Sequence, residues 1–71
     1  MEINKLNINS KYLLKYPSGK CYCLIYGGVK VEYGEKWLIW SISNKATVFH
    51  RISNRNRPQI LQEVNCSHAN L

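Results

Sequence analysis

Residues 11–53, KYLLKYPSGKCYCLIYGGVKVEYGEKWLIWSISNKATVFHRIS, decide the expected fold. This stretch contains short apolar runs, each followed within a few residues by a turn signal. The runs are KYLLKY, CYCLIY, VKVEY, WLIWSIS and TVFHRIS, and the segments between them are PSGK, GG, GEK and NKA. Short runs rich in β-branched and aromatic residues between Gly, Pro and Asn are typical of β-strands. The stretch therefore predicts a mostly β domain, a small five-stranded antiparallel meander or SH3-like barrel.

The first two turns determine which side chains are expected to share a face. Tyr16-Pro17-Ser18-Gly19 has Pro in its second position and Gly in its fourth, which suits a type I turn. Gly27-Gly28 lies between apolar runs and predicts a two-residue hairpin. In that register, one core face carries Tyr22, Leu24, Tyr26, Val29, Val31 and Tyr33. The opposite face carries Cys21, Cys23, Ile25, Lys30 and Glu32.

The third turn, Gly34-Glu35-Lys36, is compatible with two registers of the next strand, and a shift of one residue exchanges its two faces. A three-residue loop directs Trp37 and Ile39 to the core. A four-residue loop directs Leu38, Trp40 and Ile42 there, and we favour it because this set is uniformly apolar. Trp37 is then expected to be partly exposed. In the last run, one row is formed by Val48, His50 and Ile52, and the other by Phe49 and Arg51.

The chain after Ser53 predicts a short C-terminal helix. Asn56 followed three residues later by Gln59 resembles a capping box, and Pro58 fits a first helical turn. The apolar stripe of this helix would be Ile60, Leu61 and Val64. Residues 1–10 predict an extra edge strand or a loose turn. We expect one domain, 1–71, with its core in 11–65 and loose termini.

Composition favours anionic partners. The chain has 71 residues and a net charge of +6, with ten Lys and Arg against four acidic residues, all Glu. Such an excess favours nucleic acid, an acidic protein surface or a membrane face. Its longest apolar runs are much shorter than the roughly 20 residues of a membrane-spanning helix, and the N-terminus lacks the apolar region of a signal peptide. We expect a cytoplasmic protein without membrane insertion. The abundance of Asn, Lys and Ile is typical of AT-rich genomes, such as those of many viruses and plasmids.

A basic and aromatic surface is the strongest functional signal. Proteins that bind single-stranded nucleic acid combine cations for the phosphates with flat rings on which bases stack. The segment RISNRNRP contains all three Arg residues of the chain. We therefore predict a nucleic-acid-binding protein, for RNA or single-stranded DNA. The predicted site residues are Lys15, Lys20, Lys30, Trp37, Phe49, Arg51, Arg55 and Arg57.

Metal binding is not expected. Cys21 and Cys23, together with Cys66 and His68, provide ligands of the right chemistry for zinc. Their spacing of one residue is shorter than the two to four residues usual in zinc fingers. An odd number of cysteines also argues against a disulfide framework. We expect free thiols, no metal and no cofactor.

Catalysis is expected to be absent. A small ribonuclease could combine Glu32 or Glu35 with His50 and a phosphate clamp of Arg51 or Arg55. However, His50 falls in the row of Val48 and Ile52, which suits a packed histidine. We predict no catalytic residue and keep a ribonuclease as the third hypothesis.

The main alternative is a protein-interaction module, such as a small inhibitor or accessory subunit that docks on an acidic partner. The same positive charges would steer its association. Its anchor would be Trp37 or Tyr12, because exposed aromatic residues are common anchors. Edge strands of an unclosed sheet could also pair two copies into a homodimer. The oligomeric state stays open at this point.

Overall fold

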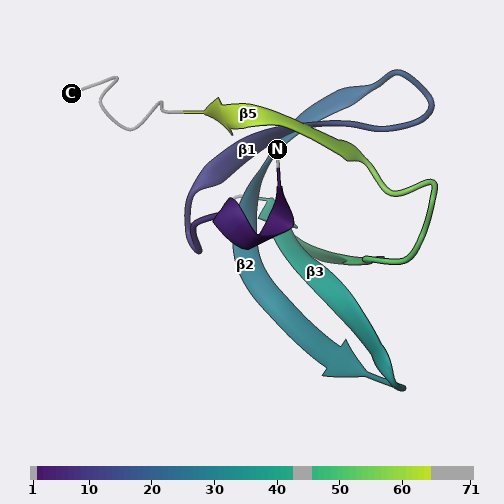
Figure 1. Ribbon diagram of the computed structural model, residues 1–71. Helices are drawn as coiled ribbons and strands as arrows, with labels where there is room; N and C mark the ends of the chain where they lie inside the picture. The colour runs from purple at the N-terminus through teal and green to yellow at the C-terminus, as the bar shows by residue number, and fades with distance from the viewer. Residues whose placement is uncertain (1, 43–45, 65–71) are drawn as a thin grey trace.

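The computed structural model describes residues 2–42 and 46–64, and it contains five strands and one short 3-10 helix. The elements are the 3-10 helix η1 (Ile3–Lys5) and the strands β1 (Lys11–Lys15), β2 (Cys21–Glu32), β3 (Glu35–Ile42), β4 (Ala46–Arg51) and β5 (Gln59–Val64). All strand pairs are antiparallel and belong to one sheet (Figure 1). The prediction of a mostly β fold with five antiparallel strands is confirmed.

The strand order is β4-β3-β2-β1-β5. The first four strands follow one another as a meander, but β5 returns to pair with β1 at the other side of the sheet. Within the described ranges, β4 and β5 each pair with one strand only, so the sheet has two edges and the expected barrel is not closed. No helix of the described residues is long and apolar enough to cross a membrane.

The two glycines at 27 and 28 lie inside β2, so the hairpin predicted there is wrong. The pairing of β2 with β3 shifts in register between Tyr26 and Gly28, which is a β-bulge. Gly28 has a φ of 101°, which only glycine adopts easily. A Cβ atom on Gly27 would lie 3.0 Å from Ile39 Cγ2, so this glycine allows β3 to approach closely. The bulge lets one long strand pair with β1 through its first half and with β3 through its second half.

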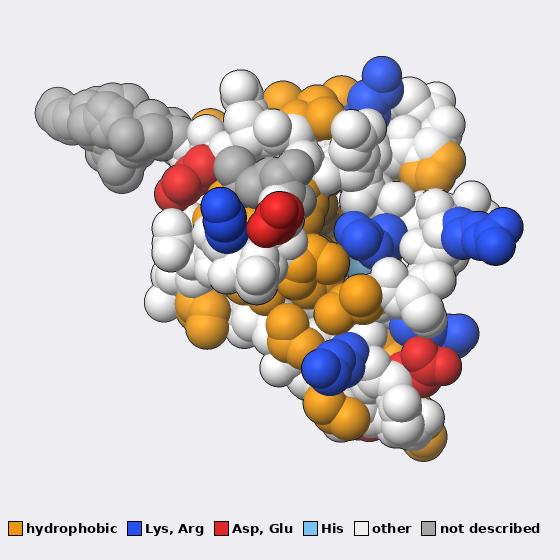
Figure 2. Space-filling model, viewed as in Figure 1, with side chains coloured by type: hydrophobic (Ala, Val, Ile, Leu, Met, Phe, Trp, Pro, Cys, Tyr) orange, Lys and Arg blue, Asp and Glu red, His pale blue; other side chains and the backbone are white. Residues whose placement is uncertain are grey.

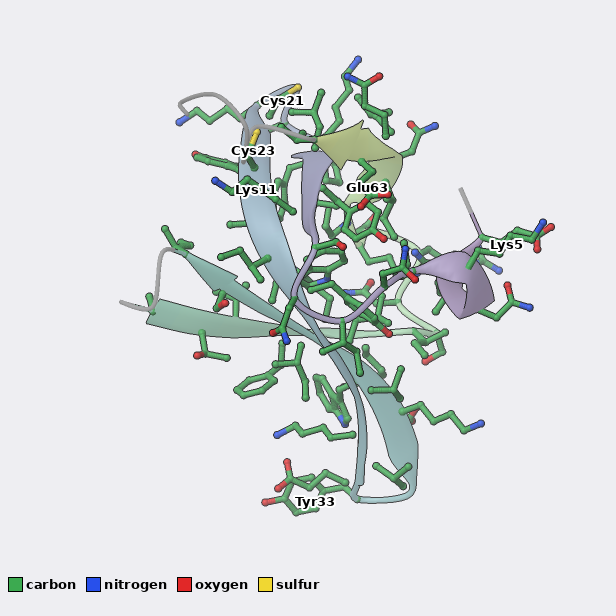
Figure 3. All side chains as sticks on the ribbon, turned by 90° about the vertical axis from the view of Figure 1, so that its left-hand side faces the viewer. Lys5, Lys11, Cys21, Cys23, Tyr33 and Glu63 are labelled. Carbon is green, nitrogen blue, oxygen red and sulfur yellow. The ribbon has the colours of Figure 1, made fainter. Side chains whose placement is uncertain are left out.

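The hairpin between β2 and β3 turns at Tyr33-Gly34, because Glu32 pairs with Glu35. Both turn residues have positive φ, 55° and 74°, as a type I′ turn requires. The core face predicted for this strand is confirmed for Leu24 and Tyr26, which are buried, and wrong for Tyr22, Val29, Val31 and Tyr33. All four side chains are exposed, and Tyr33 lies at the far tip of the hairpin (Figure 3). The turn at Tyr16–Gly19 is confirmed, since Gly19 N donates to Tyr16 O at 2.8 Å.

The expected C-terminal helix is also wrong, because this segment forms β5. Gln59 pairs with Lys15, and the register continues to Val64 opposite Lys11, with a bulge that skips Leu61. The turn before β5 is closed by Asn54, whose Oδ1 accepts from Asn56 N at 2.9 Å. Pairing with the open edge of β1 satisfies the backbone of this segment and buries Ile60 in the core. Residues 2–10 form η1 and turns rather than an edge strand.

The core lies on the inner face of the bent sheet. Its buried side chains are Tyr12, Leu14, Leu24, Tyr26, Leu38, Trp40 and Ile60. Tyr12, Tyr26 and Trp40 form an aromatic cluster with ring centroids 5.2 to 6.5 Å apart, within the usual range of favourable ring pairs. The predicted register of β3 is confirmed for Leu38 and Trp40, whereas Ile42 is exposed at the end of the strand. Tyr12 is 1% exposed, so it cannot anchor a partner.

Candidate nucleic-acid interface

Four of the predicted site residues gather on the outer face of β2, β3 and β4. Lys30 pairs with Trp37, and Trp37 pairs with Arg51 across β3 and β4. Phe49 lies two residues before Arg51, on the same face of β4. We call Lys30, Trp37, Phe49 and Arg51 the aromatic–basic face. Phe49 is 43% exposed and Trp37 is half-buried, so both rings are accessible in part.

The side chains of the aromatic–basic face contact one another as cation–ring pairs. Lys30 Nζ lies 3.9 Å from the centroid of the Phe49 ring, and Arg51 Cζ lies 5.1 Å from that of Trp37. Glu32 is the acidic neighbour: its Oε1 accepts from Lys30 Nζ at 2.8 Å. Trp37 Nε1 donates to the carbonyl oxygen of Glu32 at 3.2 Å. These contacts fix the tryptophan ring and keep two positive charges beside two flat surfaces.

Three further predicted residues meet at a second place, a hollow between the β1–β2 turn and the segment before β5. This basic pocket has a volume of about 350 Å³ and is lined by Lys15, Tyr16, Pro17, Arg55, Arg57 and Gln59. Arg57 Nε donates to the carbonyl oxygen of Ile52 at 3.0 Å. Lys20 belongs to neither cluster; it is exposed beside the β1–β2 turn. Seven of the eight predicted site residues are thus divided between two surfaces.

His50 lies next to Tyr16, one of the residues that line the basic pocket. Tyr16 Oη and His50 Nε2 are 2.9 Å apart and share a hydrogen bond, and the two rings pack edge to face. Burial lowers the pKa of His50, and the positive charge of Arg57 lowers it further. Burial also raises the pKa of Tyr16, with a second contribution from Tyr22. Both effects favour a neutral pair at physiological pH.

The contacts of His50 do not bring it to the glutamates of the ribonuclease hypothesis. Its side chain bonds to Tyr16, while the Glu35 carboxylate accepts from Ser53 Oγ at 3.3 Å and Glu32 pairs with Lys30. The expectation that His50 shares a row with Val48 and Ile52 agrees with the half-buried state of all three.

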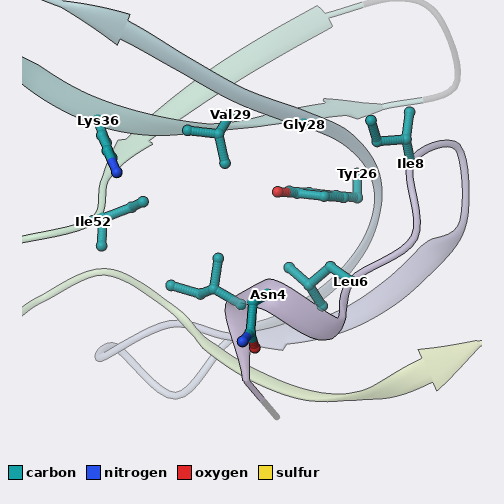
Figure 4. A pocket seen from close by; sticks show the side chains of 9 residues that line it. Asn4, Leu6, Ile8, Tyr26, Gly28, Val29, Lys36 and Ile52 are labelled. Atoms are coloured by element: carbon teal, nitrogen blue, oxygen red, sulfur yellow. The ribbon is translucent and has the colours of Figure 1, made fainter.

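Below the second half of β2, an apolar cleft opens toward solvent between η1 and the β2–β3 hairpin (Figure 4). Its volume is about 480 Å³, and its apolar lining includes Ile3, Leu6, Ile8, Val29 and Ile52. The Tyr26 hydroxyl and the Lys36 ammonium are directed into the opening. Figure 2 shows hydrophobic side chains in the middle of this view and toward the hairpin tip, with Lys and Arg around them.

The two cysteines of β2 are exposed, free thiols at the end of the strand that is far from Tyr33 (Figure 3). No group of three or more potential metal ligands occurs among residues 2–42 and 46–64. Cys66 and His68, which the zinc alternative requires, lie outside the described residues. The expectation of no metal therefore stays a prediction.

Sequence reasoning missed Tyr16 and Gln59 as lining residues of the basic pocket, and the contact of His50 with Tyr16. Tyr16 and His50 are 34 residues apart, so no local pattern could pair them. Gln59 reaches the pocket only because β5 pairs with β1. The placement of Glu32 on the same face as Lys30 was correctly predicted from their two-residue spacing, and the ion pair between them agrees with it.

The pH dependence of stability tests the environment of His50. Because its pKa is lower in the folded protein than in the unfolded chain, the unfolded state binds more protons as the pH falls below about 6.5. The contribution of His50 to the free energy of unfolding is thus present above pH 6.5 and is lost below it. Urea unfolding at several pH values in phosphate-free buffer should show this loss in the wild type and in His68→Gln. The loss should shrink in His50→Gln, and superimposable profiles of wild type and His50→Gln would contradict the assignment.

Comparison with known proteins adds no relative: no family model, no curated protein and no solved structure matches this chain.

Proposed function

We propose that this protein binds single-stranded nucleic acid, RNA or DNA, through the aromatic–basic face. The observation that carries the proposal is the alternation of cations and rings on one exposed sheet surface, with Lys30 over Phe49 and Arg51 over Trp37. Sheet surfaces that present aromatic rings and basic side chains suit splayed-out bases, because every base has a flat face that can stack. The net charge of +6 supports the same class of partner.

The present contacts of the rings do not prevent base stacking. An exposed cation–ring contact is worth about 0.5–1 kcal/mol, whereas a stacked base contributes about 1–3 kcal/mol. A base can therefore displace Lys30 or Arg51 from its ring at a net gain. The displaced side chain is long enough to turn to a neighbouring phosphate. The Lys30–Glu32 ion pair is no obstacle either, since ion pairs between solvent-exposed groups contribute about 0–1 kcal/mol.

The two tryptophans provide an internal test of the proposed surface. Trp37 lies on the aromatic–basic face, and Trp40 is 1% exposed in the core. Addition of single-stranded oligonucleotide to ¹⁵N-labelled protein should shift the Trp37 indole N–H resonance in a saturable way and leave that of Trp40 nearly unchanged. The variant Trp37→Phe assigns the two resonances. An unshifted Trp37 resonance at saturating oligonucleotide would place binding elsewhere or exclude it.

The second candidate function is docking on an acidic protein partner, and the apolar cleft favours it. Open apolar surface beside Lys36 could receive a hydrophobic side chain while the ammonium pairs with a carboxylate of the partner. Trp37 remains an available anchor, because it is half-buried at the surface. A stable complex with a cellular protein that survives nuclease treatment, and that is lost in Lys36→Glu but retained in Lys30→Glu, would favour this function over nucleic-acid binding.

A further inference from the structure

The basic pocket is built by segments that are distant in sequence but fixed to one another by the sheet. Lys15 ends β1, Tyr16 and Pro17 begin the next turn, and Gln59 pairs with Lys15 at the start of β5. The segment that carries Arg55 and Arg57 is closed by a hydrogen bond from Arg57 N to Asn54 O, 3.2 Å long. Hydrogen bonds thus hold the backbone of both walls.

Three positive charges line this pocket: Lys15, Arg55 and Arg57. None of the six lining residues is acidic, and all six belong to the described part of the chain. The hydrogen bond from Arg57 to Ile52 uses Nε and orients the guanidinium, and among residues 2–42 and 46–64 no hydrogen bond from Nη1 or Nη2 is found. An oriented guanidinium is well suited to two parallel hydrogen bonds to phosphate oxygens. The lining of the pocket therefore has no carboxylate to neutralise its three positive charges, and this favours the binding of an anion.

The size and charge of the pocket fit a phosphate group with two negative charges. A terminal phosphate carries a charge of about −1.5 to −2 at neutral pH and offers three acceptor oxygens, whereas an internal phosphodiester carries a single charge. Three cations around one pocket match the terminal group better. The pocket is open to solvent, so a phosphate bound in it can remain attached to the rest of a strand.

We propose that the basic pocket binds the terminal phosphate of a nucleic-acid strand, with Arg57 and Arg55 as its main ligands and Lys15 as a third cation. The strand-end assignment rests on the proposed function, but phosphate binding in the pocket does not. Because the pocket and the aromatic–basic face use different residues, each can be removed without the other.

The first experiment uses inorganic phosphate as the probe. The ring C–H resonances of His50 should shift saturably with phosphate at constant ionic strength set by chloride, because His50 contacts Tyr16 in the pocket wall. The dissociation constant should increase about tenfold or more in Arg55→Gln and in Arg57→Gln, as expected for loss of a charge-assisted hydrogen bond. Arg57→Gln also removes the hydrogen bond to Ile52, so a weaker binding in that variant could come from a disturbed loop before β5. Arg55→Gln keeps that hydrogen bond and therefore tests the loss of charge alone. Lys5→Gln, in η1, removes the same charge outside the pocket and should leave the constant unchanged.

The second experiment tests the strand end. An oligonucleotide with a 5′- or 3′-terminal phosphate should bind the wild type at least about tenfold more tightly than the same oligonucleotide with hydroxyl ends. That difference should disappear in Arg55→Gln and Arg57→Gln. Equal affinities of phosphorylated and unphosphorylated strands in the wild type would overturn the strand-end assignment. A non-saturable phosphate response, or one that is the same in all variants, would overturn the pocket itself. If instead the proposed function failed, all oligonucleotides would bind poorly while inorganic phosphate still bound.

Discussion

Single-stranded RNA or DNA is expected to bind the double variant Lys30→Gln/Arg51→Gln about 10–100-fold more weakly than the wild type, at roughly one order of magnitude per lost phosphate contact. Both side chains lie over rings of the aromatic–basic face, so their removal takes away the phosphate ligands and keeps the rings. The slope of log affinity against log salt should become less negative by about 1.4, because each phosphate contact on a single strand contributes about 0.7.

A matched control separates local contacts from overall charge. The double variant Lys5→Gln/Lys11→Gln loses the same two charges, and its residues lie away from the tip of the β2–β3 hairpin (Figure 3). It should retain most of the affinity. Glu32→Gln should bind more tightly than the wild type, since it removes a negative charge that now pairs with Lys30. If both double variants lost the same affinity, binding would depend on net charge and not on the aromatic–basic face.

Leu14→Ala is expected to lower the free energy of unfolding by about 2–5 kcal/mol. Leu14 is completely buried in the middle of the core, so its truncation removes apolar contacts and leaves a cavity. Domains of this size have small margins of stability, because a short chain buries a smaller share of its surface. We therefore expect Leu14→Ala to be largely unfolded at 37 °C, as measured by circular dichroism and urea titration.

The neighbouring residue provides the control for this prediction. Leu13 lies on the same strand and can also be changed to Ala. Its side chain is directed to the opposite face and is only half-buried. Leu13→Ala should cost much less than Leu14→Ala. Equal losses of stability in the two variants would contradict the observed assignment of core and outer face in β1.

Between Lys11 and Arg51 the sequence correctly indicated β-structure from its apolar runs. KYLLKY became β1, and the alternation of Leu38 and Trp40 with polar or exposed positions correctly predicted the core face of β3. The β-class of the protein follows from such local patterns. They arise because one face of an antiparallel sheet is buried and the other is exposed.

Two features could not be read from local patterns. Gly27-Gly28 resembles a hairpin turn, but the actual turn contains Tyr33, a residue that rarely adopts positive φ. The segment after Asn56 was predicted to be a helix but pairs with β1 as a strand. A short isolated helix is only marginally stable, whereas the open edge of β1 offers backbone hydrogen bonds to a neighbouring strand. Both errors concern which strands are neighbours, and this depends on contacts between residues far apart in the chain.

The same reason limits what could be predicted of the site. Lys30, Trp37, Phe49 and Arg51 were correctly expected on an outer face, but the separation of Arg55 and Arg57 into a pocket depends on β5. Composition alone treats all basic residues as one surface. The fold places Lys30 and Arg51 on the aromatic–basic face and Lys15, Arg55 and Arg57 at the basic pocket, and the variants above can distinguish these two surfaces.

The most direct test of the central claim is a fluorescence anisotropy titration of labelled single- and double-stranded RNA and DNA with the wild-type protein at several salt concentrations. We predict binding in or below the micromolar range at low salt, a steep negative dependence on salt and a preference for single strands. Absence of binding to every one of these nucleic acids at low salt would contradict the account.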